Sequence, residues 1–239
     1  MRYYKNIFAL LIIVLFISCN STTEPVYNGF MSEYFPTSIG NWWKYENWVL
    51  DSNGVRTKLV SVDSIVVEDT LFYEGKNAFK MATYSKREDT TITIISYVAL
   101  EGSKLLYYLN LKYSDGDSIP WVKSADLAQF NWTIVEKDIK NEYVSTKTEY
   151  YEKTSVTKGG IVDYTFRNEV LQAQEFITDY VQRITTITPK DTLKTDMEAT
   201  NRDLYCKGIG WVYSKYMMLK NVGYDRQGYE SILLDYYVK

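Results

Sequence analysis

Histidine is absent from the 239 residues of the sequence, and cysteine occurs only twice, at Cys19 and Cys206. Without histidine, no imidazole can activate a nucleophile, which excludes Ser-His-Asp and Cys-His mechanisms. The commonest zinc ligand is missing for the same reason, so hydrolytic metal chemistry is not expected. No Walker motif is present, and Gly208-Ile209-Gly210 lacks the third glycine of a dinucleotide-binding turn. We therefore expect no catalytic residues, no metal site and no cofactor.

Acidic residues leave two catalytic or metal-binding alternatives open. Asp115 and Asp117 flank Gly116 and could offer oxygens to calcium, but they match too few positions of a calcium loop and fit a solvated turn better. A glycosidase needs only two carboxylates, and the 30 acidic residues allow such a pair although none stands out.

Hydrophobic runs long enough to cross a membrane are also missing. The longest apolar run, residues 7–17, is much shorter than the roughly 20 residues of a spanning helix. Arg2 and Lys5 precede this run and Ser18 follows it, as in a secretory signal peptide. An ordinary signal peptide with a coincidental cysteine, or an uncleaved anchor helix, would give a similar pattern.

Residues 16–19, Phe-Ile-Ser-Cys, resemble the bacterial lipobox, although Phe16 departs from the usual aliphatic residue. The resemblance implies a signal peptide of residues 1–18 and a mature chain that begins at Cys19, which carries diacylglycerol and an N-linked acyl chain such as palmitate. Several acyl chains, at about 0.8 kcal/mol per buried methylene, would anchor the protein permanently. Residues 19–29 would form a flexible lipidated tether before a single domain of residues 30–239.

Charge and cysteine use add to this prediction. The signal carries two of the 27 basic residues and no acidic ones, so the mature chain would have 25 basic against 30 acidic residues. This balance, without a Lys/Arg cluster, argues against nucleic-acid binding.

No acidic run follows Cys19, and Asn20 stands where aspartate would suggest retention in the inner membrane. By comparison with Bacteroidetes-like lipoproteins, both features favour the periplasmic face of the outer membrane. Cys206 would have no disulfide partner and is expected to be a small buried hydrophobe.

Runs rich in β-branched and aromatic residues, separated by turn signals, predict roughly ten strands. Residues 42–51 form the first, and Ser52-Asn53-Gly54 predicts a hairpin turn after it. The other strands are expected at residues 55–68, 77–86, 90–100, 105–113, 132–140, 142–157, 161–166, 204–218 and 231–239. Within residues 105–113, one buried face should carry Leu105, Tyr107, Leu109, Leu111 and Tyr113.

Other segments depart from this pattern. Residues 114–130 form the longest break, in which residues 123–126 are expected to open a helical turn. Gly159-Gly160 predicts a hairpin turn. Residues 168–187 are expected to form a short helix or a bulged loop and then a strand. Residues 189–201 are expected to form a surface loop. With four prolines and no strand-helix alternation, the chain predicts an all-β, mainly antiparallel fold. Its curved sheet should form a barrel, half barrel or sandwich with at most one or two short helices.

Two patches carry a family resemblance: FPTSIGNWWKYE at residues 35–46 and LYCKGIGWVYSKY at residues 204–216. They look like the paired signatures of uncharacterised outer-membrane lipoproteins of Bacteroidetes-like bacteria. The resemblance implies a lipoprotein with a curved antiparallel sheet, loosely similar to half-barrel carriers of lipids and lipoproteins, and brings no established activity. The patches have a structural explanation, because Gly40, Gly208 and Gly210 permit positive φ angles or close backbone approach.

Aromatic residues are abundant, with 23 tyrosines and six tryptophans. In the doublets Tyr107-Tyr108, Tyr150-Tyr151 and Tyr236-Tyr237, only one ring of each pair can lie in the core. We expect a non-catalytic module, anchored to the membrane through Cys19, that binds an apolar ligand or another envelope protein. A carbohydrate-binding accessory lipoprotein is the alternative, and a carboxylate-dependent glycosidase comes third. An apolar concavity would favour the first of these functions, and a flat row of exposed rings would favour carbohydrate binding. Two carboxyls about 5 to 10 Å apart across a cleft would favour a glycosidase.

Overall fold

The computed structural model of the chain describes residues 29–87, 90–112, 118–143, 145–221 and 227–239. The predicted signal peptide, Cys19 and nearly all of the predicted tether lie outside the described residues, as do Asp115 and Asp117. The described residues therefore belong almost entirely to the predicted β-rich domain.

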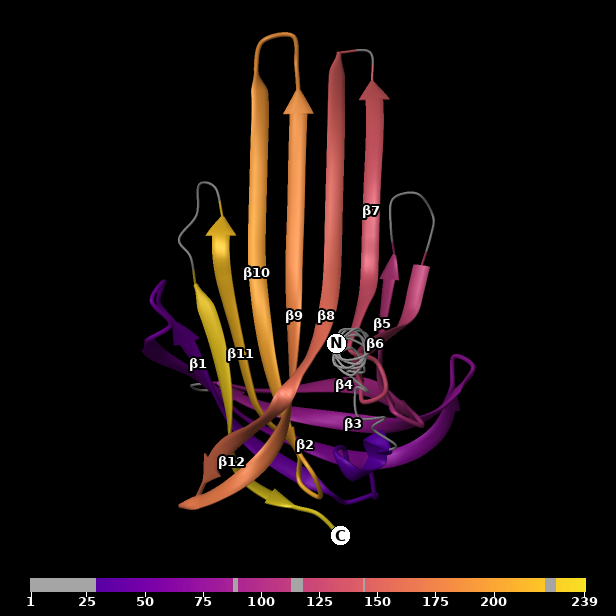
Figure 1. Cartoon of the computed structure of the whole chain (residues 1–239), viewed down its shortest axis with the longest axis vertical. Helices are drawn as coiled ribbons and strands as arrows, with labels where there is room; N and C mark the ends of the chain where they lie inside the picture. The colour runs from indigo at the N-terminus through magenta and orange to yellow at the C-terminus, as the bar shows by residue number, and fades with distance from the viewer. Residues whose placement is uncertain (1–28, 88–89, 113–117, 144, 222–226) are drawn as a thin grey trace, which may run out of the picture.

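Twelve antiparallel strands form one sheet (Figure 1). Their bounds are β1 (Trp42–Leu50), β2 (Arg56–Tyr73), β3 (Lys76–Arg87), β4 (Thr90–Glu101), β5 (Lys104–Lys112), β6 (Ser118–Asp126), β7 (Asn131–Tyr143), β8 (Thr146–Phe166), β9 (Glu169–Ile187), β10 (Thr192–Cys206), β11 (Gly210–Asn221) and β12 (Gly228–Tyr237). The one helical element in the described residues is η1 (Met31–Glu33), a single 3-10 turn. The predicted all-β antiparallel fold is confirmed.

The sheet is nearly closed into a barrel. Its order is β6-β5-β4-β3-β2-β1-β12-β11-β10-β9-β8-β7, so the first and last strands pair while the consecutive strands β6 and β7 form the two edges. At the base of this seam, Trp132 Nε1 on β7 donates to Lys123 O on β6 at 3.0 Å, and Lys123 Nζ lies 4.7 Å from the centroid of the Trp132 ring. Side-chain contacts therefore join the two edges where strand pairing does not.

Strands β7, β8, β9 and β10 extend well past the rest of the sheet (Figure 1). We call this projecting part the blade. Strands β8 and β9 contain 21 and 19 residues and pair along most of their length. No helix within the described ranges is long and apolar enough to span a membrane.

Aromatic and aliphatic side chains fill the lower part of the barrel. The η1 turn closes this end, because Met31 N donates to Gly102 O at 2.8 Å and Gly208 N donates to Glu33 O at 2.7 Å. Met31 and Phe35, on and just after this turn, are buried against the sheet. Packing of this kind supplies most of the favourable free energy of folding.

Several predictions of local structure were wrong. Residues 123–126 belong to strand β6 and form no helical turn, because they pair with β5. Residues 168–187 contain no helix, since β9 starts at Glu169 and pairs with both β8 and β10. Most of the predicted loop at residues 189–201 is the first part of β10, whose charged sequence suits a blade exposed on both faces.

The Gly159-Gly160 pair also differs from its prediction. Strand β8 runs through both glycines, and the β8–β9 register shifts between Lys158 and Ile161, so the pair marks a β-bulge and not a hairpin turn. The chain instead reverses at Arg167 and Asn168, which have φ angles of 50° and 71°. Two successive positive φ values are the geometry of a type I′ hairpin turn.

The predicted alternation in residues 105–113 holds only for its first half. Leu105 is fully buried and Tyr107 is half-buried, but Leu109 is 55% exposed. Asn110 has a φ of 47°, and the β5–β6 register shifts between Tyr108 and Leu111. The strand is therefore irregular after Tyr108, and Tyr113 lies outside the described residues.

Candidate functional site

The two sequence patches that carry the family resemblance meet in the folded protein. Trp43 Nε1 donates to Ile209 O at 2.5 Å, and the Tyr45 hydroxyl donates to Trp211 O at 2.7 Å. Gly210 has a φ of 111°, and a Cβ atom there would lie 3.1 Å from Trp43 Nε1. The prediction that this glycine permits a positive φ and a close approach is confirmed.

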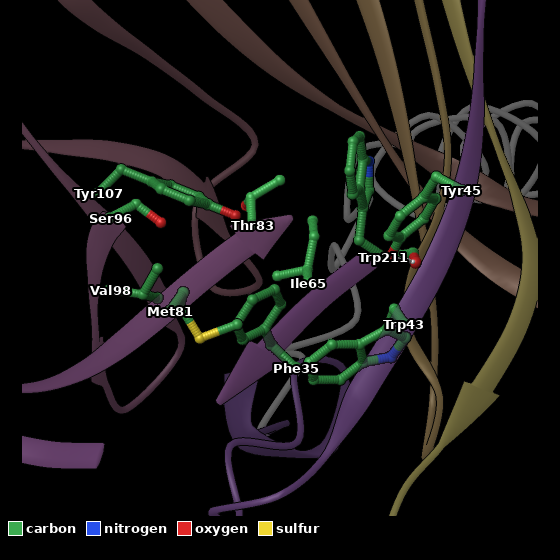
Figure 2. A pocket seen from close by; sticks show the side chains of 10 residues that line it. All are labelled: Phe35, Trp43, Tyr45, Ile65, Met81, Thr83, Ser96, Val98, Tyr107 and Trp211. Carbon is green, nitrogen blue, oxygen red and sulfur yellow. Dashed lines mark hydrogen bonds between the residues drawn. The ribbon is translucent and has the colours of Figure 1, made fainter. Parts of the chain in front are cut away.

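These aromatic residues form one wall of a cavity of about 240 Å³ inside the barrel (Figure 2). The cavity lies between strands β1 to β5, β11 and the segment after η1. Its lining consists of Phe35, Trp43, Tyr45, Ile65, Met81, Thr83, Ser96, Val98, Tyr107 and Trp211. The lining is therefore mainly aromatic and aliphatic, and its polar groups are a few hydroxyls.

The strand register explains why these side chains converge. Ile65 pairs with both Trp43 and Thr83, so the side chains from β1, β2 and β3 share one face of the sheet. Met81 pairs with Ser96 on β4, and the next pair on this face brings Val98 opposite Tyr107 on β5. Trp211 of β11 lies beside Tyr45, with the two ring centroids 4.8 Å apart, and across the cavity from Tyr107 (Figure 2).

A polar cluster lies directly behind Trp211. Trp211 Nε1 donates to Asp203 Oδ1 at 3.2 Å, and Asn201 Nδ2 donates to Asp203 Oδ2 at 2.7 Å. Ser214 donates to Asn201 Oδ1 at 3.0 Å. Burial raises the pKa of Asp203, while its hydrogen bonds act in the opposite direction. Asp203 is thus the acidic group associated with the cavity, although it is not part of the wall.

The tyrosine hydroxyls around the cavity stay protonated at neutral pH. Burial raises the pKa of Tyr45, Tyr107 and Tyr205 above the usual value near 10. These groups can donate and accept hydrogen bonds but carry no charge. The cavity therefore offers apolar contact and neutral hydroxyls.

The lining does not provide the two carboxylates of a glycosidase. None of its ten residues is acidic, so general acid-base chemistry by paired carboxyls has no basis in this cavity. Within the described ranges, no three His, Cys, Asp or Glu side chains form a group that could hold a metal ion.

The carbohydrate alternative depends on rings displayed in a flat row. An aromatic cluster on the outer face of the sheet tests this. Tyr73 stacks on Tyr97 at 3.9 Å, while Tyr108 meets Tyr73 at 81° and Trp121 at 68°. The rings therefore cover one another and do not share a plane, which is poorly suited to stacking along a sugar chain.

The doublet prediction holds for two pairs of tyrosines. Tyr107 lines the cavity while Tyr108 belongs to the outer cluster. Tyr236 packs on Phe166 beside the core, while Tyr237 is 50% exposed. No sequence pattern identified Asp203 or the cavity residues of β2, β3 and β4, because their convergence depends on the register of distant strands.

Comparisons with known proteins find two similar solved structures. One is a protein described as a candidate lipoprotein from Parabacteroides distasonis, 13% identical, with a TM-score of 0.49. The other is described as a candidate exported protein with a YmcC-like fold from Bacteroides fragilis, 14% identical, with a TM-score of 0.43. Each match covers 85% of this chain and 98% of the other. No protein-family model and no curated protein matches the sequence.

Proposed function

We propose that this protein is a non-catalytic bacterial lipoprotein that binds an apolar chain inside its barrel and is anchored to the outer membrane, facing the periplasm, through Cys19. The observation that carries the ligand-binding part is the cavity itself, which is lined mainly by aromatic and aliphatic side chains and has no charged lining residue. The anchoring part rests on the lipobox of residues 16–19.

The size of the cavity favours a slender ligand. An apolar cavity of about 150 Å³ in another protein accepts benzene, whereas sites for drug-sized ligands begin at about 300 Å³. A cavity of about 240 Å³ lies between these cases and suits part of a hydrocarbon chain. Each buried methylene contributes about 0.8 kcal/mol, so two further methylenes should strengthen binding about 15-fold.

Binding of the neutral fluorophore N-phenyl-1-naphthylamine to the full-length Cys19→Ala chain tests the cavity. Removing Cys19 ensures that no acyl chain of the anchor competes for the site. The S96F substitution places a ring in the cavity from β4 and should weaken binding at least about tenfold, because the apolar space is then filled. Titration of the fluorescence increase measures this change.

The matched control is I95F on the same strand. Ile95 is 41% exposed, and its neighbour Ser96 lines the cavity, so successive side chains of β4 point to opposite faces. I95F should bind the fluorophore as the parent chain does. Unchanged affinity in a folded S96F chain would refute the proposed function. Failure of the Cys19→Ala chain without further substitutions to bind the fluorophore would also refute it.

A further inference from the structure

Two polar atoms on the inner wall of the barrel are buried without a hydrogen-bond partner. They are Asp63 Oδ1 on β2 and Ser85 Oγ on β3, and neither has a partner in the part of the chain that the structure describes. Ser85 as a whole is only 2% exposed. No described Lys or Arg forms an ion pair with Asp63. Buried polar groups are nearly always paired, so these two atoms indicate a missing partner.

Strand register places both residues next to the cavity. Asp63 pairs with the cavity residue Tyr45 on one side and with Ser85 on the other. Each also lies two residues from a cavity residue of its own strand, which is Ile65 on β2 and Thr83 on β3. Side chains two residues apart on a strand share a face, and neither register shifts within this segment. The two unpartnered atoms therefore belong to the inner wall, one step beyond the lining residues.

The neighbouring polar side chains on this wall are already paired. The Tyr45 hydroxyl donates to Trp211 O at 2.7 Å. One pair further along β1 and β2, Asn47 Nδ2 donates to Ser61 Oγ at 3.0 Å, and Ser231 Oγ donates to Asn47 Oδ1 at 2.6 Å. None of these groups serves the two unpartnered atoms, so the missing partner is not supplied by this part of the wall.

A molecule in the cavity can reach this part of the wall. Asp63 is half-buried, so part of its side chain reaches open space, and rotation about its side-chain bonds can turn either carboxylate oxygen toward a ligand. Ile92 pairs with Ser85 and Ile94 pairs with Thr83, and both isoleucines are exposed. The inner wall is therefore open on the β4 side of the two unpartnered atoms.

We infer that the cavity ligand carries a cationic amine head that binds Asp63 and Ser85. This inference rests on the proposed function, because the cavity holds the apolar chain. The Asp63 carboxylate only accepts hydrogen bonds, whereas an ammonium offers three donors and the compensating charge. The Ser85 hydroxyl can accept from the same ammonium. A fatty carboxylate offers no donor, and its charge is repelled by Asp63.

Displacement of N-phenyl-1-naphthylamine by 1-decylamine, 1-decanol and decanoate at pH 7 tests this selectivity in the full-length Cys19→Ala chain. The three competitors share a ten-carbon chain, so the differences between them report on the head, and the amine is protonated at this pH. We expect 1-decylamine to displace the fluorophore at a concentration at least about tenfold lower than 1-decanol does, because its hydrogen bonds are charge-assisted. Decanoate should be the weakest of the three.

Three variants assign the selectivity to these residues. D63N should bring 1-decylamine and 1-decanol to within about threefold of each other, because it removes the charge and keeps the size. S85A should weaken 1-decylamine several-fold and leave the free energy of unfolding nearly unchanged, since the hydroxyl it removes has no partner. D69N makes the same carboxylate-to-amide change at an exposed position on β2 and should leave the ratio unchanged.

The outcomes separate this inference from the proposed function. Failure of the Cys19→Ala chain to bind the fluorophore refutes the proposed function and the amine head together. Fluorophore binding without a preference for 1-decylamine over 1-decanol, or with the same preference after D63N is introduced, refutes the amine head alone. If D63N does not fold, an unchanged 1-decylamine affinity in S85A is sufficient to refute it.

Discussion

The Cys206 thiol should be chemically inert in the native protein. Cys206 is 2% exposed on β10, and burial raises its pKa to about 11. At pH 8 only about one thiol in a thousand is then the reactive thiolate. In the Cys19→Ala chain, Ellman's reagent should leave the native thiol unmodified for hours at pH 8 and modify one thiol per chain in guanidinium chloride.

An added cysteine at Val170 is the matched control, because this position is 63% exposed on β9, near Ala173, which pairs with Cys206. V170C should react within minutes in the native state. Equally rapid reaction of Cys206 would contradict its burial.

At the residue scale, the sequence identified positions whose chemistry is local. Cys206 was predicted to be a buried hydrophobe and is one, and the glycines of the terminal patches have the predicted positive φ angles. Asp203 could not be identified in this way. Its hydrogen bond from Trp211 depends on the pairing of β10 with β11, and nothing in the neighbouring sequence distinguishes it from the other 29 acidic residues.

The β8–β9 hairpin provides a test at the scale of a single element. Asn168 adopts a φ of 71° in the two-residue turn, a conformation that costs asparagine less free energy than alanine. N168A should lower the free energy of unfolding by about 1 kcal/mol, whereas N168G should be neutral or slightly stabilising. Denaturant unfolding followed by tryptophan fluorescence measures both changes.

The control for this turn is N77A, at an exposed position within strand β3. It removes the same side chain from extended backbone, so it should change stability by no more than about 0.5 kcal/mol. Equal effects of N77A and N168A would contradict a role for the turn conformation.

The same hairpin shows where prediction of elements failed. Gly159-Gly160 has the composition of a turn, but β8 and β9 continue pairing on both sides of the bulge. Long strands with two exposed faces also lack the alternation of polar and apolar residues that identifies a half-buried strand. The blade, including β10, was therefore the least predictable part of the fold, whereas β1 to β5 matched their predicted bounds more closely.

At the scale of the whole molecule, strand composition predicted the all-β class but not how the sheet closes. Pairing of β1 with β12 places the two ends of the described chain side by side, and this brings the two terminal patches together. A barrel was one of three predicted shapes. Choosing among them depended on sheet curvature and on the contact between the edge strands at Trp132 and Lys123, which no local pattern encodes.

The placement of the whole molecule in the cell depends on Cys19. In bacteria fed radiolabelled palmitate, the parent chain and C206A should both incorporate the label, whereas C19A should not, because only Cys19 lies in a lipobox. C206A is a matched control, since it removes the other cysteine. Mass spectrometry of the parent chain should find an acylated thioether at an N-terminal Cys19. An unmodified sulfur at residue 19, or labelled C19A, would refute the membrane anchor and leave ligand binding by the barrel to be judged separately.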